Sequence, residues 1–298
     1  MNGKLTTLAA AGVLSLGAAA PALAGSVTQP GETVGVAAGA PLPPGLYYVN
    51  TMDFGCRDRE PVAPKVCSAL TIPVVAWSTP VTLLGARLQF LVATPALFVG
   101  VEHTTSTFGI YNPLVAGQLA WDLGNGWGFS YLFGAYLDVD SDVAWSSTSI
   151  NQRFALSYTN DGWNLTANVI WGIQLDSVTD RPQLSPCPSP FDTRGCNPDF
   201  VNVDLTATKK IGKWEFGPVA YGSTDLSKPV FDYQRQNQIA VGGLLGYDFG
   251  GVILQTYITT EVHENNYGGR DTRGWARVIV PVSKLFEEPA QTTVTRKY

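Results

Sequence analysis

Apolar and polar residues alternate with a period of two along unusually long stretches of this chain. From Trp163 to Leu175 every odd-numbered position is apolar, and the even-numbered positions are polar or small except for Ile170. Successive side chains of a β-strand point to opposite faces, so this segment would have one apolar and one polar face. It is also long enough to cross a bilayer at a tilt. The pattern therefore predicts a membrane-spanning strand.

Further segments repeat this period. They are Trp127–Val139, with Leu132 and Tyr136 as exceptions, together with Arg153–Thr159, Val201–Thr208 and Val252–Val262. Only 14% of the residues are charged, although 45% are hydrophobic. A chain poor in charge but without long apolar runs suits a transmembrane β-barrel, in which lipid-facing and lumen-facing residues alternate.

The predicted connections alternate between short turns and long loops, as in outer-membrane barrels. Turns that tolerate positive φ are expected at 124–126, 160–162, 211–213 and 248–251, with 78–80 as a fifth candidate. Long polar loops are expected near 55–70, 96–108, 140–149, 177–198, 225–236 and 263–271. Counting the segments between them gives an antiparallel, up-and-down, all-β barrel of about 12 strands.

Tryptophans gather near the short turns. Indole rings prefer the interface between membrane and water, so these residues are predicted to form a periplasmic aromatic girdle. The girdle residues are Trp77, Trp121, Trp127, Trp163 and Trp214. A soluble β-sandwich, the alternative, would have shorter strands and no girdle.

The N-terminus has the pattern of a secretory signal peptide. Lys4 precedes a run of apolar or small residues, and Ala22-Leu23-Ala24 forms a cleavage site before Gly25. A retained membrane anchor is the alternative, but the apolar run is short for a span. We therefore predict a signal peptide at 1–24, a periplasmic segment at 25–44, a barrel at 45–282 and a periplasmic tail at 283–298. The expected location is the bacterial outer membrane.

One other stretch, Val81–Val101, raises the possibility of a transmembrane helix. Arg87 and Gln89 lie near its middle, Pro95 lies inside it, and it is rich in β-branched residues. These features favour a strand pair or one long strand over a helix.

The four cysteines form two close pairs, Cys56 with Cys67 and Cys187 with Cys196. Because an exported chain meets an oxidising compartment, we expect a local disulfide in each of two extracellular loops. A zinc site is the alternative, but the C-x-x-C spacing is missing and the chain has only two histidines.

The opening of the predicted barrel resembles a known family. The run Pro43–Asn50, P-P-G-L-Y-Y-V-N, is similar to the P-P-G-L-Y-F-x-N opening of the outer-membrane transporter family associated with meta-pathway phenol degradation. Leu83–Arg87 resembles the entry into that family's third strand, and Gly109–Trp121 resembles the strand that follows. The resemblance implies passage of hydrophobic or aromatic small molecules across the outer membrane.

No enzyme motif is present, and no catalytic residue, metal or cofactor is expected. His103 and Ser106 suggest a barrel phospholipase, but residues three apart point to opposite faces of a strand. The net charge of −5, which becomes −6 without Lys4, gives no basic stripe for nucleic acid. The expected partners are outer-membrane lipid, a small-molecule solute and, during biogenesis, the barrel-assembly machinery.

Polar residues on the predicted strands should point into the lumen. They are Arg87, Arg153, Asn164, Thr166, Asn168, Asn202, Asp204, Thr206, Gln255 and Glu261. They either line an aqueous path or hydrogen-bond across a plugged barrel. Two function hypotheses follow: a selective channel or uptake pore for a small hydrophobic or aromatic compound, and a structural or adhesive barrel without transport activity.

Overall fold

The chain forms a closed antiparallel β-barrel. The structure, a computed structural model, describes residues 26–58, 64–145, 147–175, 197–229 and 233–282. The strands are β1 (Gly45–Arg57), β2 (Val66–Leu83), β3 (Ala86–Ala93), β4 (Ala96–Val101), β5 (Thr105–Ile110), β6 (Leu114–Gly124), β7 (Trp127–Tyr136), β8 (Ser149–Tyr158), β9 (Trp163–Gln174), β10 (Phe200–Ile211), β11 (Trp214–Asp225), β12 (Asn237–Asp248), β13 (Ile253–Asn265) and β14 (Asp271–Pro281).

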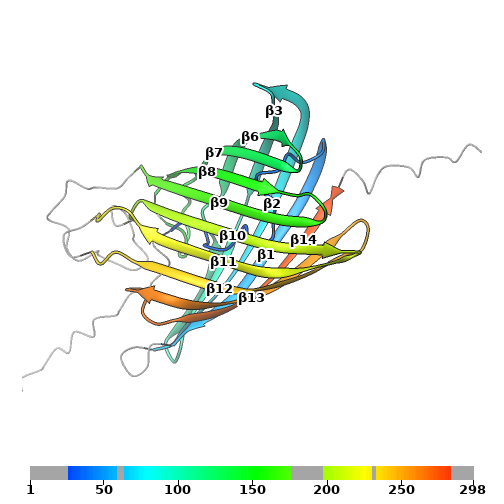
Figure 1. The fold of residues 1–298 in the computed structure, drawn as a ribbon. Helices are drawn as coiled ribbons and strands as arrows, with labels where there is room; N and C mark the ends of the chain where they lie inside the picture. The colour runs from blue at the N-terminus through cyan, green and yellow to red at the C-terminus, as the bar shows by residue number, and fades with distance from the viewer. Residues whose placement is uncertain (1–25, 59–63, 146, 176–196, 230–232, 283–298) are drawn as a thin grey trace, which may run out of the picture.

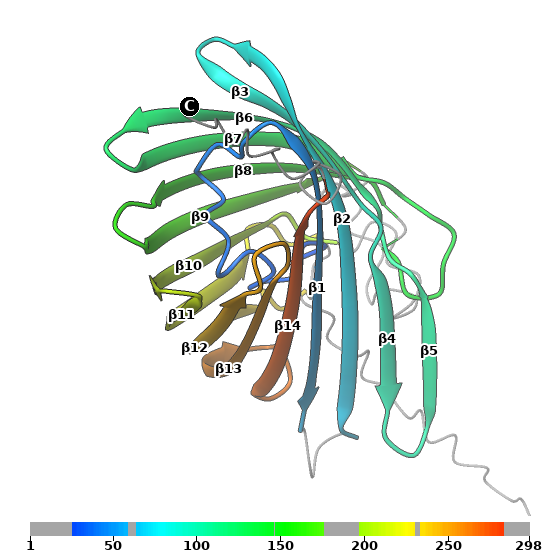
Figure 2. The same cartoon turned by 90° about the vertical axis from the view of Figure 1, so that its right-hand side faces the viewer.

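Neighbouring strands pair in chain order from β6 to β14, and β14 then pairs with β1 (Figure 1). The pairing of β1 with β2 closes the sheet, so the wall has no long open edge at this seam. β2 is long enough to pair with β3 over one half and with β4 over the other (Figure 2).

Two of the barrel strands are interrupted, which reconciles fourteen segments with twelve strands. β3 and β4 form one strand broken at Thr94-Pro95, and β5 and β6 form the next, broken at residues 111–113. Proline has no backbone N–H, so Pro95 and Pro113 each interrupt a ladder. The prediction of a closed barrel of about twelve antiparallel strands is therefore confirmed.

Asn112 satisfies the backbone at the second break. Its Nδ2 atom donates to the carbonyls of Leu137 and Trp145, at 2.9 and 2.7 Å, and its Oδ1 atom accepts from the Trp145 N–H at 2.7 Å. This fully buried side chain thus replaces ladder hydrogen bonds that the broken strand cannot make.

We expect Asn112→Ala to destabilise the barrel by about 3 kcal/mol, because three backbone groups would lose their hydrogen-bond partner at about 1 kcal/mol each. Urea unfolding of the protein in lipid vesicles would measure the loss. Thr105→Ala, at an exposed position of β5, is the control and should leave the unfolding midpoint unchanged. An equal effect of both substitutions would contradict this role of Asn112.

The outer face of the wall is apolar and the inner face is largely polar. On β9, Trp163, Val169 and Trp171 are 38–41% exposed, whereas Asn168 is 2% exposed. Ile170, the exception to the sequence pattern, points inward and is fully buried. The part of the chain that the structure describes contains no helix with the length and hydrophobicity of a membrane span.

Four of the five predicted short turns lie between strands, and the fifth prediction is wrong. Ser78-Thr79-Pro80 lies inside β2, where the register shifts between Ser78 and Thr82. The turn follows at Leu84-Gly85, where both residues have positive φ. The predicted loop at 96–108 is also wrong, because it forms β4 and most of β5. Below, the end of the barrel that carries the short turns at 84–85, 124–126, 160–162, 211–213 and 248–251 is called the short-turn end. The opposite end is called the loop end.

Candidate functional site

Residues 26–40 lie inside the barrel and are called the plug. We predicted a periplasmic segment at 25–44, whereas residues 26–40 run along the lumen before β1 begins (Figure 2). Their backbone folds into successive tight turns, including hydrogen bonds from the Glu32 N–H to the Gln29 carbonyl and from Val34 to Gly31. Such turns leave many N–H and C=O groups pointing outward, so the inner wall must supply their partners.

Three glycines spaced four residues apart bring the plug close to the wall. A Cβ atom on Gly31 would lie 2.5 Å from the ring of Tyr221, and one on Gly35 would lie 2.5 Å from Leu244. Both glycines have positive φ. A Cβ atom on Gly39 would approach backbone atoms of β7 and β8 to within 2.8 Å. Larger residues at these positions would therefore push the plug away from the wall.

Asp204 on β10 holds the first half of the plug. Its Oδ1 atom accepts from the Gly31 N–H at 2.9 Å, and its Oδ2 atom accepts from the N–H and the hydroxyl of Thr33 at 2.9 and 2.6 Å. Two residues further along β10, the Thr206 hydroxyl accepts from the Gly35 N–H at 2.7 Å. The sequence predicted that Asp204 and Thr206 face the lumen, and the structure places both against the plug.

Two arginines hold the other side of the plug. Arg277 on β14 donates to the carbonyls of Glu32 and Val34. Its Nη1 atom also donates to Oε1 of Gln255 at 3.0 Å, which fixes the guanidinium. Arg153 on β8 forms a 2.8 Å ion pair with the Glu32 carboxylate. Burial raises the pKa of Glu32, and the adjacent Arg153 guanidinium opposes that rise.

Side-chain amides complete the lining. Each donates a hydrogen bond to the plug at 2.9–3.1 Å: Asn151 and Asn168 to the hydroxyls of Thr28 and Thr33, Asn202 to Ser26 and the Thr28 carbonyl, and Asn164 and Gln255 to the Gly35 carbonyl. Of the two predicted roles for the inward polar residues, these contacts match hydrogen bonding across a plugged barrel.

A cavity of about 70 Å³ lies between the loop-end part of the plug and the wall. Val27 of the plug, together with Leu70, Leu97 and Val99, forms part of its apolar side. Polar groups on the other side include Arg57, Arg273, Ser68 and Gln238. Both apolar side chains and charged groups therefore line the lumen at this end.

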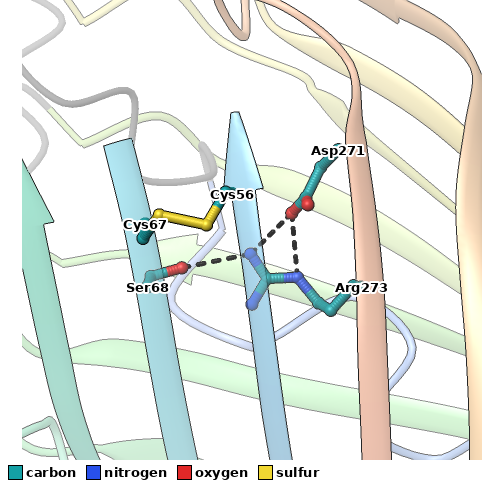
Figure 3. The surroundings of a disulfide bond; sticks show 5 residues. All are labelled: Cys56, Cys67, Ser68, Asp271 and Arg273. Atoms are coloured by element: carbon teal, nitrogen blue, oxygen red, sulfur yellow. Dashed lines mark hydrogen bonds and ion pairs between the residues drawn. A yellow bond between two sulfur atoms is a disulfide. The ribbon is translucent and has the colours of Figure 1, made fainter. Parts of the chain in front are cut away.

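Ion pairs fix both of these arginines. Arg273 donates to Asp271 from Nε and Nη2, and its Nη2 atom also donates to Ser68 at 3.1 Å (Figure 3). Its Nη1 atom donates to Asp53. Arg57 forms a bidentate pair with Glu261, which the sequence also predicted to face the lumen. Two guanidiniums therefore face three carboxylates. The charge-assisted hydrogen bonds between them hold both guanidiniums in fixed positions.

The disulfide Cys56–Cys67 joins directly opposed residues of β1 and β2 beside this network (Figure 3). It confirms the first predicted cysteine pair, but the two cysteines lie in strands rather than in the predicted loop at 55–70. The second pair, Cys187 with Cys196, lies outside the described residues and stays a prediction, as do the signal peptide at 1–24 and the tail at 283–298. Within the described ranges, no three His, Cys, Asp or Glu side chains gather into a metal-binding group.

The remaining predicted residues occupy the wall away from the plug. Arg87 on β3 donates to the Thr79 carbonyl at 3.3 Å. The side chains of Trp77, Trp127, Trp163 and Trp214 point outward and are 41–51% exposed, and Trp121 is half-buried against Phe129. His103 lies in the turn after β4, where its side chain is 91% exposed. Its Nε2 atom lies 3.6 Å from Oε1 of Glu102.

Sequence reasoning missed the plug itself and the two arginines of β14. The spacing Gly31-x3-Gly35-x3-Gly39, in a segment rich in small residues, was a signal of close packing that could have revealed the plug. Arg273 and Arg277 alternate with Trp275, so all three share the inward face of β14. An apolar residue between two arginines obscured the two-residue period there.

The closed wall with an inward polar face defines the chain as a β-barrel of the outer-membrane type. A channel from the outer membrane of Pseudomonas putida F1 has the same fold, with 12% sequence identity, a TM-score of 0.60, and coverage of 85% of this chain and 99% of that chain. The chain belongs to the family described as "Putative MetA-pathway of phenol degradation", whose model matches residues 46–278.

Two other solved barrels are less similar. The β domain of the Bordetella autotransporter BrkA has 10% identity, a TM-score of 0.48, and coverage of 79% of this chain and 98% of that chain. The outer membrane phospholipase A of Escherichia coli has 13% identity, a TM-score of 0.39, and coverage of 81% and 97%. The comparison with curated proteins found no match to this sequence.

Proposed function

We propose that this protein is a selective outer-membrane channel for a small hydrophobic or aromatic compound. The observation that carries the proposal is the plug, because it fills a polar lumen and contacts the wall through hydrogen bonds and an ion pair rather than through covalent links. Such contacts hold the segment in place but are individually worth only about 1–3 kcal/mol net. A barrel occluded in this way is suited to passage of selected solutes rather than open diffusion.

The apolar side of the loop-end cavity supports the substrate class. Val27, Leu70, Leu97 and Val99 offer a surface on which an apolar body can leave water. The family to which the chain belongs and the channel from Pseudomonas putida F1 agree with this proposal. A structural barrel without transport activity is the alternative, and the absence of solute passage would favour it.

Charged residues that touch the plug should control ion preference if ions pass beside it. In planar bilayers we expect Asp204→Asn to shift the reversal potential toward anions and Arg153→Gln to shift it toward cations. Asp122→Asn is the control, because Asp122 lies beside an exposed short turn and accepts from the Gly124 N–H. The same reversal potential in all variants would show that these residues do not line the path.

Transport itself is tested in cells. Disruption of the gene should slow growth on low concentrations of a hydrophobic or aromatic carbon source, and the intact gene should restore it. Normal growth across a broad panel of such compounds, together with no conductance of the purified barrel, would favour the structural alternative.

A further inference from the structure

A groove of about 490 Å³ lies on the outer face of the barrel, across strands β7 to β12. An apolar cavity of roughly 150 Å³ is already enough to bind benzene. Apart from Trp127, the side chains around it are almost all aliphatic, among them Leu165, Leu205, Ala207 and Val241. The groove is therefore large and apolar enough to hold part of a lipid acyl chain.

The groove lies where the ladder of paired residues between β10 and β11 is interrupted. Their pairing passes from Thr206 with Val219 to Lys209 with Phe216, so Pro218 and the facing Ala207 have no paired partner in this ladder. Pro218 has no N–H to donate. Small side chains at these positions form the floor, and exposed leucines at positions 165 and 205 form its rims.

Positive charge lies immediately beside this apolar floor. Lys209 follows Ala207 on the same face of β10, and its Nζ atom lies 4.9 Å from the centroid of the Trp163 ring. It also donates to the Asp161 carbonyl. Lys213 is exposed in the adjoining turn, whereas Lys210 is paired with Asp248 at 2.6 Å.

This clustering of lysines is specific to one turn of the barrel. Three of the eight lysines of the chain lie within residues 209–213. An ammonium held over an indole ring at the membrane interface can meet a lipid phosphate while its alkyl stem stays in the apolar layer. The short turns of outer-membrane barrels face the periplasm, so these lysines lie at the level of the inner-leaflet head groups.

We propose that the groove is a binding site for one anionic phospholipid of the inner leaflet. One acyl chain lies over Ala207 and Pro218, and the phosphate is held by Lys209 and Lys213. Charge complementarity favours this occupant over a second copy of the chain. A symmetric contact between two copies through the groove would bring two sets of lysines toward each other.

The test compares two phospholipids that differ only in the head group. The purified barrel in detergent is titrated with dioleoyl phosphatidylglycerol or with dioleoyl phosphatidylethanolamine, and native mass spectrometry counts the bound molecules. We expect the anionic lipid to bind at least tenfold more tightly, with one molecule retained per barrel.

Variants separate the head-group site from the acyl-chain site. Lys209→Gln with Lys213→Gln should lower the affinity for phosphatidylglycerol to that for phosphatidylethanolamine. Ala207→Leu should fill the groove and weaken both lipids about fivefold. Matched controls are Lys65→Gln near the loop end and Ala135→Leu on the outer face of β7, and both should bind as the wild type does.

Three results would overturn the proposal. Equal affinity of the wild type for the two lipids would show that head-group charge plays no role. Unchanged binding in the double lysine variant would show that Lys209 and Lys213 do not bind the head group. A dimer that dissociates in Ala207→Leu would assign the groove to a second copy of the chain.

Discussion

Removal of residues 26–40 should raise the single-channel conductance of the purified barrel at least tenfold. The plug occupies the lumen along its length, and its contacts reach from Ser26, beside Asn202, to Gly39, beside Ser157. Without it, the amides and charged groups of the wall would be free to bind water, and a water-filled lumen conducts ions. Planar-bilayer recordings of the deletion variant would measure this change.

A point variant and a folding control sharpen this experiment. Gly35→Val should raise conductance to a smaller extent, because a side chain at this positive-φ position would approach Leu244. Heat-dependent migration on gels would show that each variant still forms a barrel. A folded deletion variant with wild-type conductance would mean that another part of the chain closes the path.

Arg273→Ala should destabilise the barrel by about 3–5 kcal/mol, the usual effect of removing one partner from a buried charge pair. Asp53 and Asp271, each under 7% exposed, would then be left as uncompensated carboxylates in the wall. Urea unfolding in lipid vesicles would report the loss of unfolding free energy.

The same carboxylates provide the matched test of this mechanism. Adding Asp53→Asn and Asp271→Asn to Arg273→Ala should recover part of the lost stability, because the uncompensated charges disappear. Arg235→Ala, at an exposed position near the loop end, is the control and should cost less than about 0.5 kcal/mol. No recovery in the triple variant would indicate that packing of the guanidinium, rather than charge, explains the loss.

The wall of the barrel could be predicted from sequence because each strand carries its own signal. The period of two in Trp163–Leu175 follows directly from a strand that faces lipid on one side and the lumen on the other. Turn signals were reliable where glycine or asparagine supplies positive φ, as at Asn125 and Asp161-Gly162. They failed at Pro80, because a shift in register lets proline remain within β2.

The plug could not be predicted in the same way because its structure depends on distant partners. The segment has no strand-like period of two, and the bonds that fix it come from residues such as Asp204 and Arg277, more than 170 positions away. Sequence reasoning identified Asp204 as inward-facing, but a single chain offers no sign of what an inward carboxylate will contact. The same limit applies to the pairing of Arg273 with Asp53.

The place of the plug along the chain has a consequence for biogenesis. Residues 26–40 leave the ribosome before any strand of the wall, yet one of their main partners, Arg277, belongs to the last strand. Because contacts between distant residues form slowly, the plug must stay unfolded and free of wrong partners while the whole wall is synthesised and exported. The earliest segment of the barrel to be made is therefore among the last to acquire its native contacts.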